Sequence, residues 1–128
     1  MIILIPASVG ELIDKITILQ LKVERLSSRE QLSNIQYELG LLTEVRAKHG
    51  IEGPDFEKKV AALKIINSAL WEVEDLIRDC ERRNDFRERF IELARSVYKL
   101  NDKRAAAKRD INSMFGSDIT EEKSYAPY

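Results

Sequence analysis

One arginine constrains this chain more than any other feature, because it lies on the apolar seam of the last predicted helix. The seam advances in steps of three and four residues and comprises Phe86, Phe90, Leu93, Val97, Leu100, Arg104, Ala107, Ile111 and Met114. A guanidinium turned toward a helical core needs a partner, since an unpaired buried charge is costly. The sequence therefore predicts a polar layer around Arg104, with Asn101 and Lys108 beside it.

Three further amphipathic segments precede this helix. Capping boxes, in which a Ser or Asp is followed three residues later by Glu or Gln, predict helix starts at Ser8, Ser28 and Asp85. Turns are expected near Ser27, residues 50–55 and Arg83. Because the connections are short, the sequence favours an all-α fold: an up-down-up-down antiparallel four-helix bundle with a long last helix, in one domain that spans residues 1–128.

Both ends of the chain are expected to be ordered against this bundle. Met1–Ile5 is an apolar run, too short to cross a membrane or to act as an export signal, so we expect a cytoplasmic protein. The last helix would be roughly 43 Å long against roughly 28 Å for each of the first two. We expect the short extended N-terminal segment, residues 1–7, and the tail after Gly116 to cover its overhang. The expected anchors of the tail are Tyr125, Pro127 and Tyr128.

Composition excludes several classes of protein. The formal net charge is −1, and Asp102 and Asp110 interleave the basic residues of the last helix, so we expect no nucleic-acid partner. Cys80 is the only cysteine and His49 the only histidine, too few for a Cys/His zinc site or for Ser-His-Asp or Cys-His catalysis. We expect no cofactor, no metal ion and no membrane partner, and a non-catalytic protein is favoured over an enzyme.

Antiparallel packing allows the polar residues to be placed in layers. If the first and last helices meet at a shared end of the bundle, Tyr98 lies level with Asp14, and Asn101 lies level with Glu11. Asn67 reaches the same layer from the third helix, where the pattern calls for a hydrophobic residue. The predicted site residues are Glu11, Asp14, Asn67, Tyr98, Asn101, Arg104 and Lys108.

Two interpretations of this layer remain open. In the first it is structural: Arg104 pairs with Asp14 or Glu11, the asparagines bond each other or Tyr98, and the layer fixes the register of the bundle. In the second, Arg104, Lys108 and the amino end of the first helix bind the phosphate or carboxylate of a small anionic ligand, such as a nucleotide or a nucleotide sugar.

A third interpretation is an enzyme. Helical nucleoside triphosphate pyrophosphohydrolases hold Mg²⁺ with carboxylates spaced i, i+3 on facing helices, and this spacing occurs at Glu11/Asp14 and at Glu72/Asp75. The second pair, however, points roughly 140 to 200 degrees away from the apolar seam of its helix. The enzyme is therefore the least favoured interpretation.

The sequence also predicts self-association. The first helix carries apolar residues on two sides, which is more than an outer helix of a monomeric bundle needs: Leu12, Ile16 and Leu19 on one, Ile18 and Leu21 on the other. Met1–Ile5 is a second apolar segment without an assigned partner. We expect a homo-oligomer that forms through one of these two segments.

Four blocks of sequence carry a resemblance. They are Pro6–Leu19, then Leu70-Trp71 with Glu74-Asp75, then Ala94–Tyr98 with Asn101-Asp102 and Arg104, and finally Glu121–Tyr125. In these blocks, which span nearly the whole chain, the protein resembles a family of small all-helical bacterial and phage proteins of unknown function. The resemblance implies no activity and no functional residue, and it adds only sugar nucleotides to the candidate ligands.

Overall fold

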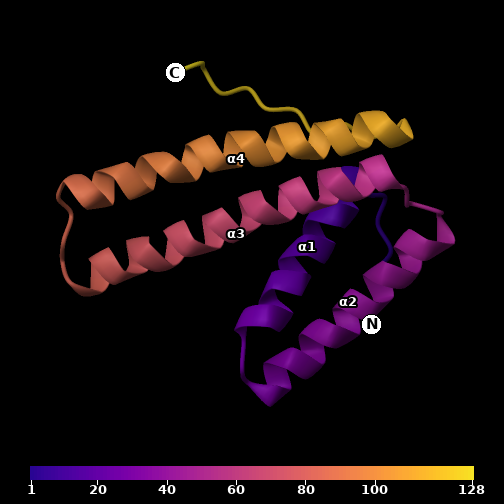
Figure 1. The fold of residues 1–128 in the computed structure, drawn as a ribbon, viewed down its shortest axis with the longest axis horizontal. Coiled ribbons are helices and arrows are strands. Elements are labelled where there is room, and N and C mark those ends of the chain that lie inside the picture. The colour runs from indigo at the N-terminus through magenta and orange to yellow at the C-terminus, as the bar shows by residue number, and fades with distance from the viewer.

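The computed structural model describes residues 1–128 and contains four α-helices: α1 (Val9–Arg25), α2 (Arg29–Lys48), α3 (Pro54–Arg82) and α4 (Glu88–Phe115). They form two antiparallel hairpins, α1–α2 and α3–α4, which together make the predicted all-α four-helix bundle (Figure 1). α1 is the central helix because it packs against all three others, whereas the backbone of α2 approaches only that of α1. The two hairpins meet at one end and point their turns in different directions (Figure 1).

Two of the three predicted capping boxes start helices as expected. The Ser8 hydroxyl accepts a hydrogen bond from the Glu11 N–H at 3.1 Å, and Ser28 caps α2 in the same way. The third box is wrong, because α4 begins at Glu88, and its N-cap residue makes no side-chain hydrogen bond. Asp85 instead accepts hydrogen bonds from Arg87, including its Nε at 3.0 Å, and a charge-assisted bond of this kind competes successfully with a helix cap.

The hydrophobic core lies where the two hairpins meet. Seven buried residues form it: Ile13, Ile16, Ile51, Phe56, Val60, Leu63 and Ile111. The Phe115 ring packs edge-on against Phe56 at a centroid distance of 5.0 Å and closes this end. The other half of the α3–α4 hairpin, which runs from Asn67 through the turn to Ala105, contains only one buried hydrophobic residue between these two positions, Cys80. The free energy of apolar burial is therefore concentrated at one end of the α3–α4 hairpin.

The two chain ends behave differently from each other. The prediction that residues 1–7 cover the overhang of α4 is wrong, because Met1–Ile5 are all exposed and make no backbone hydrogen bond to the rest of the chain. The tail does return along α4, after Gly116 ends that helix in the left-handed conformation at φ 59° (Figure 1). The ring of the predicted anchor Tyr128 lies 5.3 Å from that of Tyr98, although Tyr128 and Tyr125 are both largely exposed, at 78% and 81%.

No helix of the protein combines the length and the apolar composition needed to cross a lipid bilayer.

Candidate functional site

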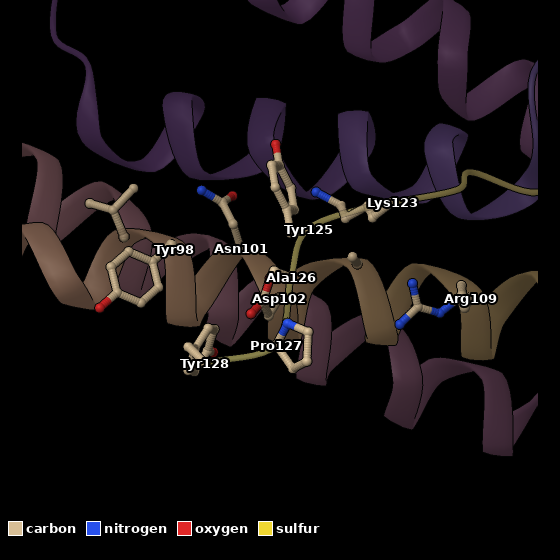
Figure 2. Close-up of a pocket in the computed structure, with 11 residues that line it drawn as sticks. Tyr98, Asn101, Asp102, Arg109, Lys123, Tyr125, Ala126, Pro127 and Tyr128 are labelled. Atoms are coloured by element: carbon tan, nitrogen blue, oxygen red, sulfur yellow. The ribbon is translucent and has the colours of Figure 1, made fainter.

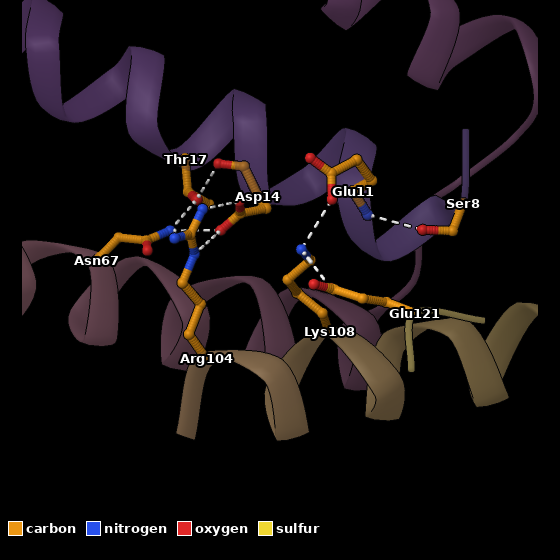
Figure 3. Close-up of polar contacts among 8 residues, drawn as sticks. All are labelled: Ser8, Glu11, Asp14, Thr17, Asn67, Arg104, Lys108 and Glu121. Atoms are coloured by element: carbon orange, nitrogen blue, oxygen red, sulfur yellow. Dashed lines mark hydrogen bonds and ion pairs between the residues drawn. The ribbon is translucent and has the colours of Figure 1, made fainter. Parts of the chain in front are cut away.

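Asp14 is the centre of a buried polar network between α1, α3 and α4 (Figure 3). Its carboxylate is 1% exposed and accepts a bidentate pair of hydrogen bonds from Arg104, of which the Nε bond measures 2.9 Å. Asn67 Nδ2 lies 3.0 Å from both Asp14 Oδ1 and Thr17 Oγ1, so one amide group joins two α1 side chains to α3. The hydrogen bond to Asp14 raises the pKa of Arg104 above its ordinary value. The network therefore favours the charged form of the Arg104 guanidinium.

Lys108 forms a second cluster about one turn farther along α4. Its ammonium group lies 2.7 Å from Glu11 of α1 and 2.9 Å from Glu121 of the tail, and its side chain is only 10% exposed (Figure 3). Burial lowers the pKa of Lys108, but the hydrogen bonds with the two glutamates outweigh burial and raise it overall. One ammonium group thus fastens both the first turn of α1 and the C-terminal tail to α4.

The backbone of α1 touches α4 directly at Gly10. The Gly10 N–H donates to Asn112 Oδ1 at 2.6 Å, which satisfies one of the donors that a helix N-terminus leaves free. A Cβ atom at this position would lie 2.6 Å from the backbone carbonyl oxygen of Lys108. Only glycine permits this approach, which brings Asp14 and Glu11 within reach of the two α4 cations.

The structure joins five of the seven predicted site residues in these two clusters. Tyr98 lies outside them, and Asn101 bonds to neither cluster but lines a recess beside Glu11, Arg104 and Lys108. The predicted pairing of Arg104 with Asp14 is confirmed. The predicted bonding of Asn67 with Asn101 or Tyr98 is wrong, because the Asn67 amide is taken up by Asp14 and Thr17. The α1–α4 register also differs: Arg104 rather than Tyr98 lies level with Asp14, and Lys108 rather than Asn101 lies level with Glu11.

Tyr98 and Asn101 line a pocket between α4 and the tail (Figure 2). Its volume is about 810 Å³, and its walls are Val97, Tyr98, Asn101, Asp102, Ala105 and Arg109 from α4 and Lys123, Tyr125, Ala126, Pro127 and Tyr128 from the tail. A smaller polar recess of about 210 Å³ adjoins it, lined in part by Arg104, Lys108 and Glu121. Both spaces border Asn101 and Lys123, so the pocket continues to the edge of the buried network.

Four participants were missed from the sequence. Thr17 was detectable in principle, because it follows Asp14 by three residues and so shares its face of α1. Gly10 and Asn112 meet through a close backbone approach that no sequence pattern indicates. Glu121 reaches Lys108 from a tail without periodic structure, so its partner was not predictable from spacing.

The carboxylates invoked for magnesium do not come together. Glu72 and Asp75 are exposed on α3, while Glu11 and Asp14 face Lys108 and Arg104. No group of three or more His, Cys, Asp or Glu side chains is arranged to hold a metal ion. The geometry gives no support to the pyrophosphohydrolase interpretation.

Comparison with known proteins agrees with the resemblance seen in the sequence. A profile described as a family of unknown function, DUF6165, matches residues 3–128. The chain belongs to the DUF6165 family. No curated protein and no solved structure matches it. Three of the four blocks that carry the resemblance contribute to one region of this DUF6165 protein: Pro6–Leu19 and the blocks at residues 94–104 and 121–125.

The contact between Lys108 and Glu121 predicts that acid releases the tail. The hydrogen bond from Lys108 lowers the pKa of Glu121 below its ordinary value of 4.5. A carboxyl group whose pKa is lowered by folding stabilises the folded state above its unfolded pKa, and this stabilisation disappears as the pH falls through the folded pKa. We therefore expect residues 118–128 to detach below pH 4.5 while the four helices persist.

Backbone chemical shifts and ¹⁵N relaxation of residues 118–128, followed by NMR as the pH is lowered, measure this release, since no N–H group of the tail donates a backbone hydrogen bond that amide exchange could report. Because the Glu121 side chain is 49% exposed, the change in global stability should be small. The control is Glu121→Gln, which cannot ionise and should show a mobile tail already at neutral pH. Tail relaxation that is the same above and below the transition would contradict the prediction.

Proposed function

We propose that this DUF6165 protein is a non-catalytic, self-associating helical bundle whose buried polar network fixes the position of α1 on the α3–α4 hairpin. The observation that carries the proposal is the mutual pairing of the charged groups: Asp14 with Arg104, and Lys108 with Glu11 and Glu121. No buried side-chain nitrogen or oxygen lacks a hydrogen-bond partner. A catalytic acid, base or nucleophile would need a group free to react with substrate, and this network supplies none.

The same pairing weakens the case for an anion site at Arg104 and the amino end of α1. Both Arg104 and Lys108 already pair with carboxylates of the protein, and the Gly10 N–H already donates a hydrogen bond to Asn112. A ligand phosphate on Arg104 would have to displace the Asp14 carboxylate and leave it buried without its counter-charge, which costs several kcal/mol. The network therefore favours a structural role over this second function.

Met1–Ile5 supports self-association. These five aliphatic residues are between 64% and 114% exposed, and no backbone hydrogen bond outside the helices involves residues 1–7. An extended apolar segment with unpaired N–H and C=O groups is a ready partner for a second strand. The other predicted interface is less available, because α1 uses both apolar sides internally, with Ile16 2% and Leu21 3% exposed.

We infer that two copies pair their Met1–Ile5 segments across a twofold axis, as identical surfaces do in most homodimers. Sedimentation equilibrium at tens of micromolar protein should give twice the monomer mass of 14.8 kDa. Ile3→Lys/Ile5→Lys introduces charges on one side of the segment, and Ile3→Pro removes a backbone donor. We expect both variants to be monomeric with unchanged helix content by circular dichroism.

A matched control distinguishes this segment from other exposed apolar positions. Ile65→Lys/Ile91→Lys alters two residues of the α3–α4 hairpin that are 70% and 55% exposed, and it should leave the dimer intact. A monomeric wild-type protein would remove self-association from the proposal. Loss of the dimer only in the α3–α4 variant would assign the interface to that hairpin instead of the N-terminal segment.

A further inference from the structure

The pocket between α4 and the tail has the size of a ligand site. Its volume of about 810 Å³ lies within the range of roughly 300–1,000 Å³ that is typical of pockets for small molecules. One wall is the regular surface of α4, and the other is the tail from Lys123 to Tyr128 (Figure 2). The tail is tied down at both ends of the pocket, by Glu121 on Lys108 and by the Tyr128 ring on Tyr98.

The charges that line this pocket differ from those of the buried network. Arg109 and Lys123 border the pocket, and neither forms an ion pair with a carboxylate, in contrast to Arg104 and Lys108 nearby. The one side-chain carboxylate in the lining belongs to Asp102, and its hydrogen bonding and negative charge raise the pKa of Tyr128. The pocket thus offers two unpaired cations to an anion, and Arg can bind a phosphate through two parallel hydrogen bonds.

The remaining lining suits a planar ring joined to hydroxyl groups. The Tyr98 and Tyr128 rings meet edge to face, and both are exposed, at 44% and 78%. Aromatic side chains in such a pair still present free faces on which a base can stack. The Asn101 side chain forms no hydrogen bond within the protein and lies in the lining, where it can donate and accept at once.

We propose that this pocket binds a nucleoside phosphate, with the base against Tyr98 and Tyr128 and the phosphate on Arg109 and Lys123. Inorganic phosphate alone would leave most of the 810 Å³ empty, and an uncharged nucleoside would leave both cations unpaired. Asn101 and Asp102 border the pocket between these two ends, where they can hydrogen-bond ribose hydroxyls. The proposal does not depend on self-association, because every residue in it comes from one chain.

Isothermal titration with AMP and UMP tests the proposal, with adenosine and inorganic phosphate as separate arms. We expect saturable binding of the nucleotides at one site per chain, and binding of either fragment that is weaker by about tenfold or more. Arg109→Gln/Lys123→Gln removes both free cations and should weaken nucleotide binding by about tenfold or more. The matched control is Arg29→Gln/Lys48→Gln, two exposed α2 cations without ion-pair partners, which should stay within about twofold of wild type.

Several outcomes would overturn the proposal. These are the absence of saturable binding of both nucleotides up to about 10 mM, equal affinity for inorganic phosphate or for adenosine, and unchanged affinity in the Arg109→Gln/Lys123→Gln variant. Unfolding curves of every variant, recorded by circular dichroism, show whether the altered proteins remain folded. Neither Arg109 nor Lys123 forms an ion pair, and the Lys123 ammonium lies 5.6 Å from the centre of the Tyr125 ring, which is 81% exposed. We therefore expect the melting temperature of the Arg109→Gln/Lys123→Gln variant to match that of the wild type.

Discussion

Replacing Arg104 with alanine is expected to destabilise the protein by about 3–5 kcal/mol, because the substitution leaves the Asp14 carboxylate buried without its counter-charge. Asp14 is 1% exposed and would retain only the amide of Asn67 as a side-chain partner. The Arg104 side chain is 30% exposed, so water can reach part of the vacated space, and we expect a loss at the lower end of this range. Urea unfolding followed by circular dichroism measures the change.

Two further variants serve as controls for this substitution. Arg95→Ala removes an exposed α4 arginine without an ion pair and should change stability by less than about 0.5 kcal/mol. The triple variant Asp14→Leu/Asn67→Leu/Arg104→Met replaces the layer with hydrophobic side chains and should be nearly neutral. A loss of about 1 kcal/mol or less in Arg104→Ala would instead indicate an arginine that is free to bind an external anion.

The sequence identified the polar network because the network interrupts a regular pattern. Arg104 and Asn67 each occupy a position where three- and four-residue spacing calls for a hydrophobic side chain, and both contact Asp14. Such interruptions are visible without any knowledge of tertiary structure, since they need only helical periodicity. Helix content and the positions of the turns were predictable for the same local reason.

The alignment of α1 with α4 was not predictable in this way. Placing the first and last helices at a shared end of the bundle put Tyr98 beside Asp14, whereas Arg104, six residues later, is the actual partner. The short connections fix only sequential neighbours, α1 with α2 and α3 with α4. Because α1 has 17 residues and α4 has 28, α1 can lie at several heights along the longer helix. Tertiary packing selects one of them.

The pocket was outside the reach of sequence analysis for a different reason. Its second wall is the tail, which has no helical period, and the contacts that hold the tail depend on single side chains such as Glu121 and Tyr128. Sequence spacing carries information about residues of the same element, and it carries none about an irregular segment that returns over a helix. Tyr98 and Asn101 were therefore selected as candidates, but the pocket that they line with the tail was not predicted.

Gly10→Ala is expected to destabilise the protein by about 1–3 kcal/mol, even though alanine favours helices over glycine. The added Cβ would lie 2.6 Å from the Lys108 carbonyl oxygen and 2.9 Å from Asn112 Oδ1. The first of these atoms belongs to the backbone in the middle of α4 and cannot move aside, so α1 must shift away. The shift would stretch the 2.6 Å hydrogen bond from the Gly10 N–H and separate Glu11 from Lys108.

Gly40→Ala is the matched control, because it adds the same methyl group to a helical glycine that has no neighbouring atom within 4 Å of the new Cβ. At position 40 only the helix propensity changes, and we expect the free energy of unfolding to increase by about 0.5–1 kcal/mol. The two substitutions should therefore shift the urea midpoint in opposite directions. If Gly10→Ala were as stabilising as Gly40→Ala, the close contact of α1 with α4 would be refuted. The joint positioning of Asp14 and Glu11 would then need another cause.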